Sequence, residues 1–469
     1  MTRPAENIHF VGIGGVGMSG LAELLHARGH VITGSDLKEN PTTRRLAELG
    51  LGIHLGHQKD HLGEAQRVVA STAIAEDNPE LVEARKRGVP IIRRGEMLAE
   101  IMRPKQGIAV AGSHGKTTTT SLIGHVLEAA GLDPTSIVGG RVMGAEANAS
   151  GIRIGESNLL VAEADESDGS FLLLEPTIAV ITNIDPEHLD HYGDFERLES
   201  AFVDFANAVP REGLAVVCAD HPGVQAILPK LQARRISYGF SSTADLVATR
   251  MSREGEGIRF GVEAGGHRLG NVELPLPGDH NILNALAAIA VGLELDVSFS
   301  DIALGLSRFG GVERRYQVLG RRGGIEVVDD YAHHPAELLA TLEAARSVHP
   351  GRIVSVFQPH RYTRTRDCME EFATAFGASD VVIISEIYPA GDSPIPGITG
   401  GVLASKIADQ GHPDVRFIAD LETIGEELAQ SLDSGDLVLT LGAGDVSKLG
   451  RQILERLPAP PQDQGRAEA

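Results

Sequence analysis

The chain has 469 residues, a net charge of −22 and two cysteines. A chain of this length is expected to form about three domains of roughly 150 residues each. The negative charge argues against non-specific binding to nucleic acid, and the absence of Trp argues against base-stacking surfaces. Cys218 and Cys368 are too few for a disulfide framework or a thiolate zinc site. Without a signal-peptide pattern or an apolar run long enough to cross a bilayer, a cytoplasmic protein with no membrane insertion is expected.

Residues 1–104 are typical of a domain built around a parallel sheet. A helical pattern runs through Leu21 and Leu25 and ends near Gly29. Strands are expected at 8–13, 31–33, 68–71 and 89–92, and a second helix at 78–87. The alternation of strands and helices predicts a βαβ arrangement, which ends at the polar, proline-containing segment 103–106.

A glycine-rich loop follows the first strand. It reads Gly12-Ile13-Gly14-Gly15-Val16-Gly17, and Asp36 closes the next strand, as in dinucleotide-binding loops. Taken alone, the loop would suggest NAD with Asp36 on a ribose. Such a loop binds any diphosphate, however, and a simple packing turn is the alternative.

A second loop, in the expected central domain at 105–311, is more informative. The strand at 107–111 runs into Gly112-Ser113-His114-Gly115-Lys116-Thr117, and a helix is predicted over 116–130. Glycines let backbone N–H groups surround a phosphate, and the helix directs its positive end at it. Lys116 is expected to reach the β- and γ-phosphates of ATP, and Thr117 to bind Mg²⁺. The loop is shorter than a standard Walker A loop, and a turn that merely joins strand to helix is the alternative.

Polar residues follow two further predicted strands, 159–162 and 178–181. Four carboxylates crowd the end of the first strand, and these would repel one another unless a cation lay among them. They are Glu163, Asp165, Glu166 and Asp168. A solvated acidic loop is the alternative. His188 and His191 follow the second strand and could ligate a metal or serve a structural role.

A third α/β domain is predicted at 312–456, with strands at 325–328, 353–357, 381–384 and 437–440. Arg314 and Arg315 lie at its start, where they could clamp a γ-phosphate or be ordinary surface charge. Arg361 and Arg364 suit a carboxylate such as that of an amino acid. The proline-rich segment 457–469 is predicted to be a disordered tail.

Taken together, these motifs resemble those of the Mur ligases, the ATP-dependent amide-bond ligases of bacterial peptidoglycan synthesis. The segments that carry the resemblance run through all three predicted domains in order, which makes it specific. They are 12–20, 112–118, 163–168, 279–284, 314–315, 329–335 and 359–365. The resemblance implies an α/β fold of three domains. An N-terminal Rossmann-like domain would bind a UDP-sugar, a central P-loop ATPase-type domain would bind ATP, and a C-terminal Rossmann-like domain would bind the amino acid.

Within the family, the chain is most similar to the members that join L-alanine to UDP-N-acetylmuramate. The implied reaction begins when the muramoyl carboxylate attacks the γ-phosphate of ATP. The amine of L-alanine then attacks the acyl phosphate, and the tetrahedral intermediate collapses to the amide, ADP and phosphate. The implied partners are these substrates and no nucleic acid, in a monomer or homodimer.

The resemblance also implies roles for individual residues. The catalytic set would comprise Lys116, Glu163, His188, Arg315 and His333. Mg²⁺, with Mn²⁺ as an alternative, would be held by Thr117, Glu163 and His188. ATP would be bound by Gly112, Ser113, His114, Gly115, Lys116, Thr117, Thr118, Asn281, Asn284, Arg314, Arg315, Asp329 and Asp330. The UDP-sugar would be bound by Gly14, Gly15, Val16, Gly17, Met18, Ser19, Asp36 and Ser71. The amino acid would be bound by His333, His360, Arg361 and Arg364.

Some choices stay open. Either arginine of the pair 314–315, and either acid of the pair 329–330, could be the primary residue. Sister ligases carry a lysine, often carbamylated, after the His-x-Asp segment, and residues 193–210 contain no lysine. A second metal held by His188 would have to replace it, which favours the L-alanine subgroup.

Three other functions are compatible with parts of the sequence. A nicotinamide-dependent oxidoreductase would explain the first loop and Asp36 but leaves 112–117 unexplained. A non-catalytic nucleotide-binding module would bind ATP without turnover. A related ligase that adds a murein tripeptide to the same UDP-sugar is disfavoured by the Gly-Gly-x-Gly-Met-Ser-Gly form of the first loop.

Overall fold

The computed structural model describes residues 4–143, 151–255 and 257–458. The chain divides into two compact units. Unit 1 comprises Met1–Met251, Arg259–Leu274 and Ile282–Gly310, and unit 2 comprises Ser252–Ile258, Pro275–Asn281 and Gly311–Ala469. No helix within the described ranges combines the length and the hydropathy needed to cross a membrane.

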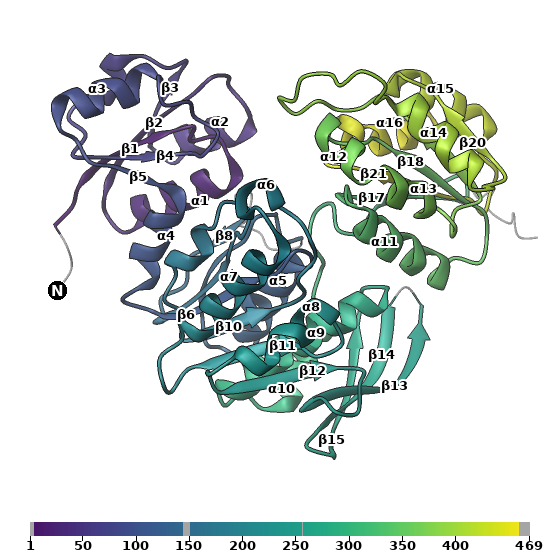
Figure 1. The fold of residues 1–469 in the computed structure, drawn as a ribbon, viewed down its shortest axis with the longest axis horizontal. Coiled ribbons are helices and arrows are strands. Elements are labelled where there is room, and N and C mark those ends of the chain that lie inside the picture. The colour runs from purple at the N-terminus through teal and green to yellow at the C-terminus, as the bar shows by residue number, and fades with distance from the viewer. Residues whose placement is uncertain (1–3, 144–150, 256, 459–469) are drawn as a thin grey trace, which may run out of the picture. The chain divides into compact units, whose positions relative to one another are not determined.

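Unit 1 begins with a five-stranded parallel sheet in the order β3-β2-β1-β4-β5 (Figure 1). Its strands are β1 (Asn7–Val11), β2 (Val31–Asp36), β3 (Gly52–Leu55), β4 (Arg67–Ala70) and β5 (Ile91–Arg93). Its helices are α1 (Val16–Ala27), α2 (Pro41–Glu48), η1 (Lys59–Leu62), α3 (Pro79–Arg87) and α4 (Arg94–Met102). The strand order reverses between β1 and β4, and such sheets bind ligands outside the carboxyl ends of the strands at this point.

A ten-stranded sheet, most of whose residues belong to unit 1, has the order β15-β14-β13-β12-β11-β10-β6-β9-β7-β8. Its strands are β6 (Gln106–Ala111), β7 (Thr135–Ile137), β8 (Ile152–Arg153), β9 (Leu159–Glu163), β10 (Ile178–Ile181), β11 (Leu214–Cys218), β12 (Arg235–Gly239), β13 (Leu246–Glu254), β14 (Gly257–Ala264) and β15 (His267–Leu274). The central strands β9, β6, β10 and β11 are parallel and completely apolar at their cores because helices cover both faces.

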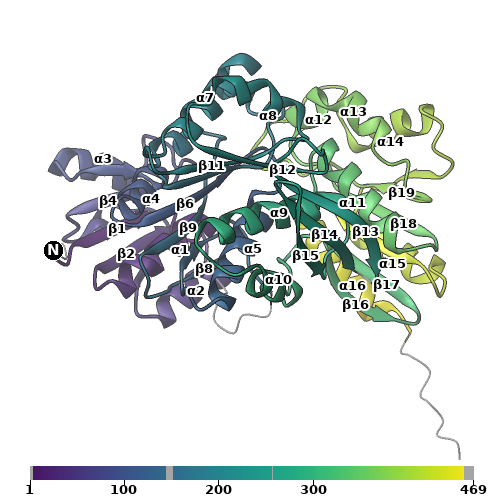
Figure 2. The ribbon, with the colours of Figure 1, turned by 90° about the horizontal axis from the view of Figure 1, so that it is seen from below.

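The helices of this part lie on opposite sides of the sheet. Figure 2 shows α5, α9 and α10 on one side and α7 and α8 on the other. The helices are α5 (Lys116–Ala129), η2 (Ser170–Leu173), α6 (Leu189–Tyr192), α7 (Phe195–Asn207), α8 (Pro222–Ile227), η3 (Leu228–Lys230), α9 (Asp279–Glu294) and α10 (Phe299–Ser307). This arrangement places the amino end of α5 beside the carboxyl ends of β6 and β9.

Unit 2 contains a six-stranded sheet in the order β16-β17-β21-β18-β19-β20, in which β16 is antiparallel to β17 and the other pairs are parallel. Its strands are β16 (Gln317–Arg322), β17 (Ile325–Asp330), β18 (Ile353–Phe357), β19 (Val381–Ile384), β20 (Val415–Phe417) and β21 (Leu437–Leu441). Its helices are α11 (Pro335–Val348), α12 (Tyr362–Asp367), α13 (Met369–Thr374), α14 (Gly400–Asp409), α15 (Leu421–Ser431), η4 (Asp445–Lys448) and α16 (Leu449–Arg456).

Successive residues of the unit 2 strands point into two separate cores. Val328 packs with Leu338 and Leu342 of α11 on one face, whereas Val327 packs with Ile424 of α15 on the other. Leu457 is buried in this second core, so it belongs to the folded unit rather than to the predicted tail at 457–469. The part of that tail from residue 459 onward lies outside the described residues.

One buried carboxylate links several elements of the five-stranded sheet. Glu80, at the start of α3, accepts hydrogen bonds from Ser35 Oγ at 2.5 Å and Gln58 N at 3.2 Å, and it lies 2.9 Å from His61 Nδ1 and 3.4 Å from His9 Nε2. Burial opposes the charge of this carboxylate, but the bonds from His9, Ser35 and Gln58 lower its pKa to about 2.

We expect Glu80→Gln to lower the free energy of unfolding by about 2–4 kcal/mol at pH 7, because it leaves these donors without their anion. The folded pKa lies below that of the unfolded carboxyl, so the stabilisation is complete above about pH 4.5 and is lost as the pH falls toward 2. Urea unfolding at pH 7 and pH 3.5 measures the difference, which should shrink in acid. Glu83→Gln, on the same helix but partly exposed, is the control. An equal difference at both pH values would contradict the ionic role of Glu80.

Candidate active site

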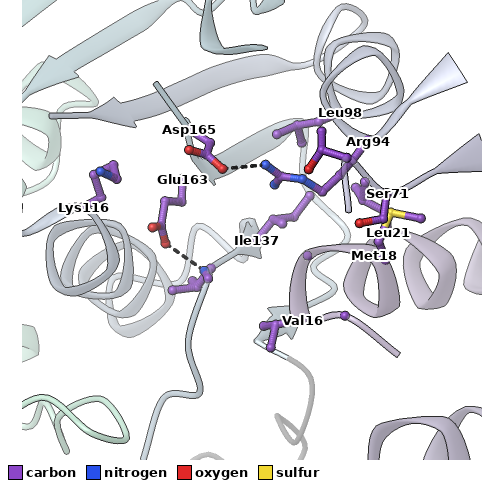
Figure 3. A pocket seen from close by; sticks show the side chains of 15 residues that line it. Val16, Met18, Leu21, Ser71, Arg94, Leu98, Lys116, Ile137, Glu163 and Asp165 are labelled. Carbon is purple, nitrogen blue, oxygen red and sulfur yellow. Dashed lines mark hydrogen bonds and ion pairs between the residues drawn. The ribbon is translucent and has the colours of Figure 1, made fainter. Parts of the chain in front are cut away.

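A cavity of about 350 Å³ in unit 1 brings the two predicted phosphate-binding loops together (Figure 3). Gly15 and Gly17 of the first loop and Ser71 after β4 line one part of it, and Lys116 and Glu163 line another. The lining residues come from the carboxyl ends of β1, β4, β7 and β9 and from the helices α1, α4 and α5. The fold therefore builds one site from two loops that are 100 residues apart in the sequence.

The first loop ends at a helix whose amino end is free to bind an anion. Gly15 is the N-cap of α1, no side chain caps the helix, and its first turn carries no acid. Met18 N donates to the Gly15 carbonyl, and no side chain caps the helix, an arrangement that suits the binding of an anion. Gly14 N donates to Asp36 Oδ2 at 2.9 Å, so the predicted Asp36 holds the loop itself. Ser19 is buried and donates to the Val16 carbonyl.

Among the residues predicted for the UDP-sugar, five line the cavity. They are Gly15, Val16, Gly17, Met18 and Ser71. The other three, Gly14, Ser19 and Asp36, take part in the local bonds of the loop, as described above.

Arg94 is a cation of this cavity that the sequence analysis missed. It is the first residue of α4, and its Nη2 donates to Asp165 Oδ2 at 2.8 Å (Figure 3). Its guanidinium lies against Gly17, where a Cβ would be 3.1 Å from Nη1. Arg94 thus joins the glycine loop to the acidic end of β9. The signal was present, because Arg93 and Arg94 follow directly after a predicted strand, where ligands bind.

The second loop has a backbone that only glycine adopts without strain at two positions. Gly112 has a φ of +137° and Gly115 a φ of +79°. A Cβ on Gly115 would lie 2.7 Å from Asn284 Oδ1. The loop is held from outside by Asn183, whose Oδ1 accepts from His114 N at 2.7 Å. The predicted loop is therefore rigid, and Asn284 of α9 lies directly beside it.

Lys116 is the first residue of α5, and its ammonium group is hydrogen-bonded to neighbouring residues. Its ammonium group donates to the carbonyls of Gly112 and Ser113 and, at 2.8 Å, to Glu166 Oε1. Burial opposes charge on both side chains. The carboxylate of Glu166 nevertheless raises the pKa of Lys116, and burial raises the pKa of Glu166 to about 7. Glu163, which ends β9, and the three carboxylates that follow it each have a hydrogen-bond partner within the fold, and the Asp165 side chain is still 37% exposed.

Thr117 and Glu163 form a set of hard oxygen donors beside the loop. Thr117 Oγ lies 3.1 Å from both carboxylate oxygens of Glu163, and Glu163 Oε2 accepts from Gly139 N at 2.7 Å. A hydroxyl and a carboxylate are ligands that suit Mg²⁺, so these residues fit the predicted cation. His188, the third predicted ligand, has a left-handed backbone with φ +56°, and its Nε2 lies 3.7 Å from Glu166 Oε1.

In unit 2, the predicted arginine and aspartate pairs lie at the carboxyl end of β17. Arg314 Nε donates to Asp329 Oδ2 at 3.0 Å, and its guanidinium also bonds to the Gly442 carbonyl. Arg315 Nη1 lies 3.4 Å from Glu337 Oε1. Both guanidinium groups lie over the ring of Tyr331, at 4.8 and 5.4 Å. Arg314 is therefore tied to the sheet of unit 2, whereas Arg315 is directed toward α11.

The two aspartates differ in their partners. Asp329 accepts from Thr440 Oγ at 2.7 Å and from Arg314, and Asp330 accepts from the backbone N–H groups of Tyr316 and Ala332, each at 2.7 Å. Burial raises the pKa of both carboxyls, that of Asp330 to about 6. Asp329 is thus bonded to two side chains, whereas the hydrogen bonds described for Asp330 come from backbone N–H groups, and the charge of Arg315 opposes the rise in the pKa of Asp330.

The residues predicted for the amino acid gather at the carboxyl ends of β17 and β18. The rings of His333 and His360 lie 5.8 Å apart, and Arg364 Nη1 lies 3.3 Å from His360 Nδ1. Burial and the neighbouring His333 lower the pKa of His360 to about 4, so its ring is neutral near pH 7. Arg361 is exposed and has a φ of +71°.

Asn281, a predicted ATP residue, is buried in unit 2 and donates to the Pro277 carbonyl.

Comparison with known proteins assigns the family. Models of three Mur ligase domains match: the domain described as Mur ligase family, catalytic domain, at residues 7–106, the Mur ligase middle domain at 110–292, and the domain described as Mur ligase, glutamate ligase domain, at 314–444. The chain belongs to the Mur ligase family. The predicted family and the predicted α/β fold of three domains are confirmed, and the described residues form three sheets.

Similar proteins cover nearly the whole length of this Mur ligase. The UDP-N-acetylmuramate–L-alanine ligase of Sorangium cellulosum (strain So ce56) is 53% identical over 463 residues, which is 98% of each chain. The crystal structure of the UDP-N-acetylmuramate–alanine ligase of Thermotoga maritima is 31% identical, with a TM-score of 0.83 over 96% of this chain and 99% of that one. A murein peptide ligase from Psychrobacter arcticus 273-4, at 24% identity and a TM-score of 0.70 over 96% and 98% of the chains, shares the fold.

Proposed function

We propose that this Mur ligase joins L-alanine to the carboxylate of UDP-N-acetylmuramate, using ATP, in peptidoglycan precursor synthesis. The observation that carries the proposal is the single cavity that contains both the amino end of α1 and Lys116. One loop suits the diphosphate of a UDP-sugar and the other suits the phosphates of ATP. A shared cavity lets the carboxylate of one substrate approach the γ-phosphate of the other. The names of two relatives, UDP-N-acetylmuramate–L-alanine ligase at 53% identity and UDP-N-acetylmuramate–alanine ligase at 31% identity, support L-alanine as the amino acid.

The protein's contribution to phosphoryl transfer is to position the reactants and to neutralise charge. Lys116 stabilises the transferring phosphoryl group, and the N–H groups of the loop from Gly112 to Gly115 hold the phosphate chain. The acyl phosphate that forms has a good leaving group in place of a poor one, so the amine of the amino acid can displace it. His114, Thr118 and Asn284 complete the ATP site in unit 1.

Thr117 and Glu163 are proposed to hold Mg²⁺, with His188 as a ligand of a second ion. When bound, the metal neutralises charge on the phosphate oxygens. In unit 2, Arg315 with Arg314 is proposed to bind phosphate, Asp330 or Asp329 to bind the ribose, and Asn281 to bind the adenine side. The amino acid would be held by His333, His360, Arg361 and Arg364.

Release of phosphate tests the function directly. The enzyme is incubated with Mg²⁺ and ATP, with UDP-N-acetylmuramate, with L-alanine, and with both. Release that requires both substrates would support the proposal. Release with a murein tripeptide but not with alanine would identify a recycling ligase instead. ATP binding without release under any of these conditions would indicate a nucleotide-binding module.

We expect Arg94→Ala to raise the KM for UDP-N-acetylmuramate about 10- to 100-fold, because it removes a cation from the diphosphate loop. The KM for ATP should change less than threefold. Steady-state kinetics with each substrate varied in turn measures both constants. Arg103→Ala, an exposed arginine just after the same helix, is the matched control. A rise in the KM for ATP alone would indicate that Arg94 binds ATP rather than the UDP-sugar.

A further inference from the structure

We propose that Glu166 is a positioning residue for Lys116, which anchors the ammonium group while phosphate oxygens replace the loop carbonyls around it. The inference rests on the proposed function, because it concerns the approach of Lys116 to the transferring phosphate. Glu166 belongs neither to the phosphate loop nor to the proposed Mg²⁺ ligands, so the inference gives this carboxylate a role of its own.

All three hydrogen-bond donors of the Lys116 ammonium group are already in use. An ammonium group has three donors, and Lys116 Nζ has three acceptors in the structure: the carbonyls of Gly112 and Ser113 and the Oε1 atom of Glu166. A phosphate oxygen can therefore bind to Nζ only by replacing one of these acceptors. Lys116 keeps a fixed position when ATP binds only if the acceptor that phosphate replaces is not the one that anchors the ammonium group.

The carboxylate is the acceptor that holds most strongly. A hydrogen bond between two charged groups is roughly twice as strong as one to a neutral carbonyl, and burial strengthens it further. The Glu166 side chain is 3% exposed, and the Lys116 side chain is 15% exposed. We therefore expect the carbonyls of Gly112 and Ser113 to yield to phosphate and Glu166 to remain bound.

Glu166 is itself held rigidly. Its backbone carbonyl accepts from Tyr192 Oη at 2.5 Å and from Gly169 N at 3.1 Å. Its second carboxylate oxygen, Oε2, is buried and has no hydrogen-bond partner among the described residues. A buried carboxylate oxygen without a partner is costly, and a residue kept only to stabilise the fold would be expected to satisfy both oxygens. The side chain thus serves Lys116 through one oxygen at a cost to stability.

The test is Glu166→Gln, which keeps the shape of the side chain and removes the charge. We expect kcat to fall at least tenfold, and the Kd for Mg·ADP, which keeps the β-phosphate but lacks the transferring phosphate, to rise by a clearly smaller factor. Glu166→Asp keeps the charge but is one methylene shorter, so it should retain an intermediate kcat. Asp168→Asn, in the same loop and bonded to Ser170 N, is the matched control and should leave kcat within twofold.

A double-mutant cycle with Lys116→Arg separates positioning from a general effect on the fold. If Glu166 acts through Lys116, the double variant loses no more kcat than the more damaged single variant. Unchanged kcat in Glu166→Gln, additive losses in the cycle, or an equal weakening of ADP binding would each overturn the inference. Failure of the wild-type enzyme to release phosphate with alanine would instead refute the proposed function, so the two failures are distinguishable.

Discussion

Lys116→Ala is expected to reduce alanine-dependent phosphate release by about a thousandfold or more. Lys116 is the basic residue of the phosphate loop, and its ammonium group lies at the amino end of α5, where the phosphates of ATP are proposed to bind. The loss of one preorganised cation at a transferring phosphoryl group costs several powers of ten in rate. Single-turnover measurement of phosphate release gives the effect on the chemical step.

The structure adds a stability effect to this prediction. Removing Lys116 leaves the buried Glu166 carboxylate without its cation, which is destabilising. We expect the double variant Lys116→Ala, Glu166→Gln to recover the lost thermal stability but not the activity. Lys230→Ala, at an exposed site whose nearest acid is 3.9 Å away, is the control for loss of a lysine. Normal product formation by a folded Lys116→Ala protein would refute the assignment of the loop.

Glu163→Gln is expected to lower kcat by about a hundredfold and to shift the Mg²⁺ dependence to higher concentration. Glu163 and Thr117 supply the hard oxygen donors at the loop, and an amide is a weaker ligand for Mg²⁺ than a carboxylate. Titration of activity with Mg²⁺ at saturating substrates measures the shift. Since Gln still accepts from Gly139 N, the fold of the loop should be preserved.

Two results would contradict this role of Glu163. One is an unchanged Mg²⁺ dependence, which would place the cation elsewhere. The other is full activity of the variant when Mg²⁺ is raised only slightly above the wild-type requirement. Glu175→Gln, an exposed acid beyond η2, is the control for a change in net charge.

The sequence was sufficient for the parts of the fold that depend on local pattern. The strands predicted at 178–181, 353–357 and 381–384 are β10, β18 and β19 with the same bounds, because short apolar runs buried on both faces have sharp edges. The prediction of two phosphate loops also rested on local pattern, since a strand, a glycine turn and a helix are contiguous. The resemblance to the Mur ligases, which ran through all three predicted domains, was confirmed.

Most omissions concern structure that depends on partners distant in the sequence, although β11, a short apolar run buried along its whole length, was also not predicted. β13 and β15 were not predicted, because their residues are largely polar and partly exposed and lack the continuous apolar run of a buried strand. The pair of Arg94 with Asp165 joins positions 71 residues apart, and that of Lys116 with Glu166 joins positions 50 residues apart. Such contacts follow from the register of strands and the packing of helices, so a single sequence indicates the residue types but not which of them pair.

The cavity shared by the two loops has a consequence for inhibition. A molecule that imitates only one nucleotide must compete with that nucleotide at the concentration that the cell maintains. A compound that presents one anionic group to the amino end of α1 and another to Lys116, on a tether that spans a cavity of about 350 Å³, would engage both loops at once. The second contact would then form at the high effective concentration set by the tether, so the affinity would exceed that of either half by orders of magnitude. Resistance to such a compound would require change in glycine loops whose backbone tolerates little substitution.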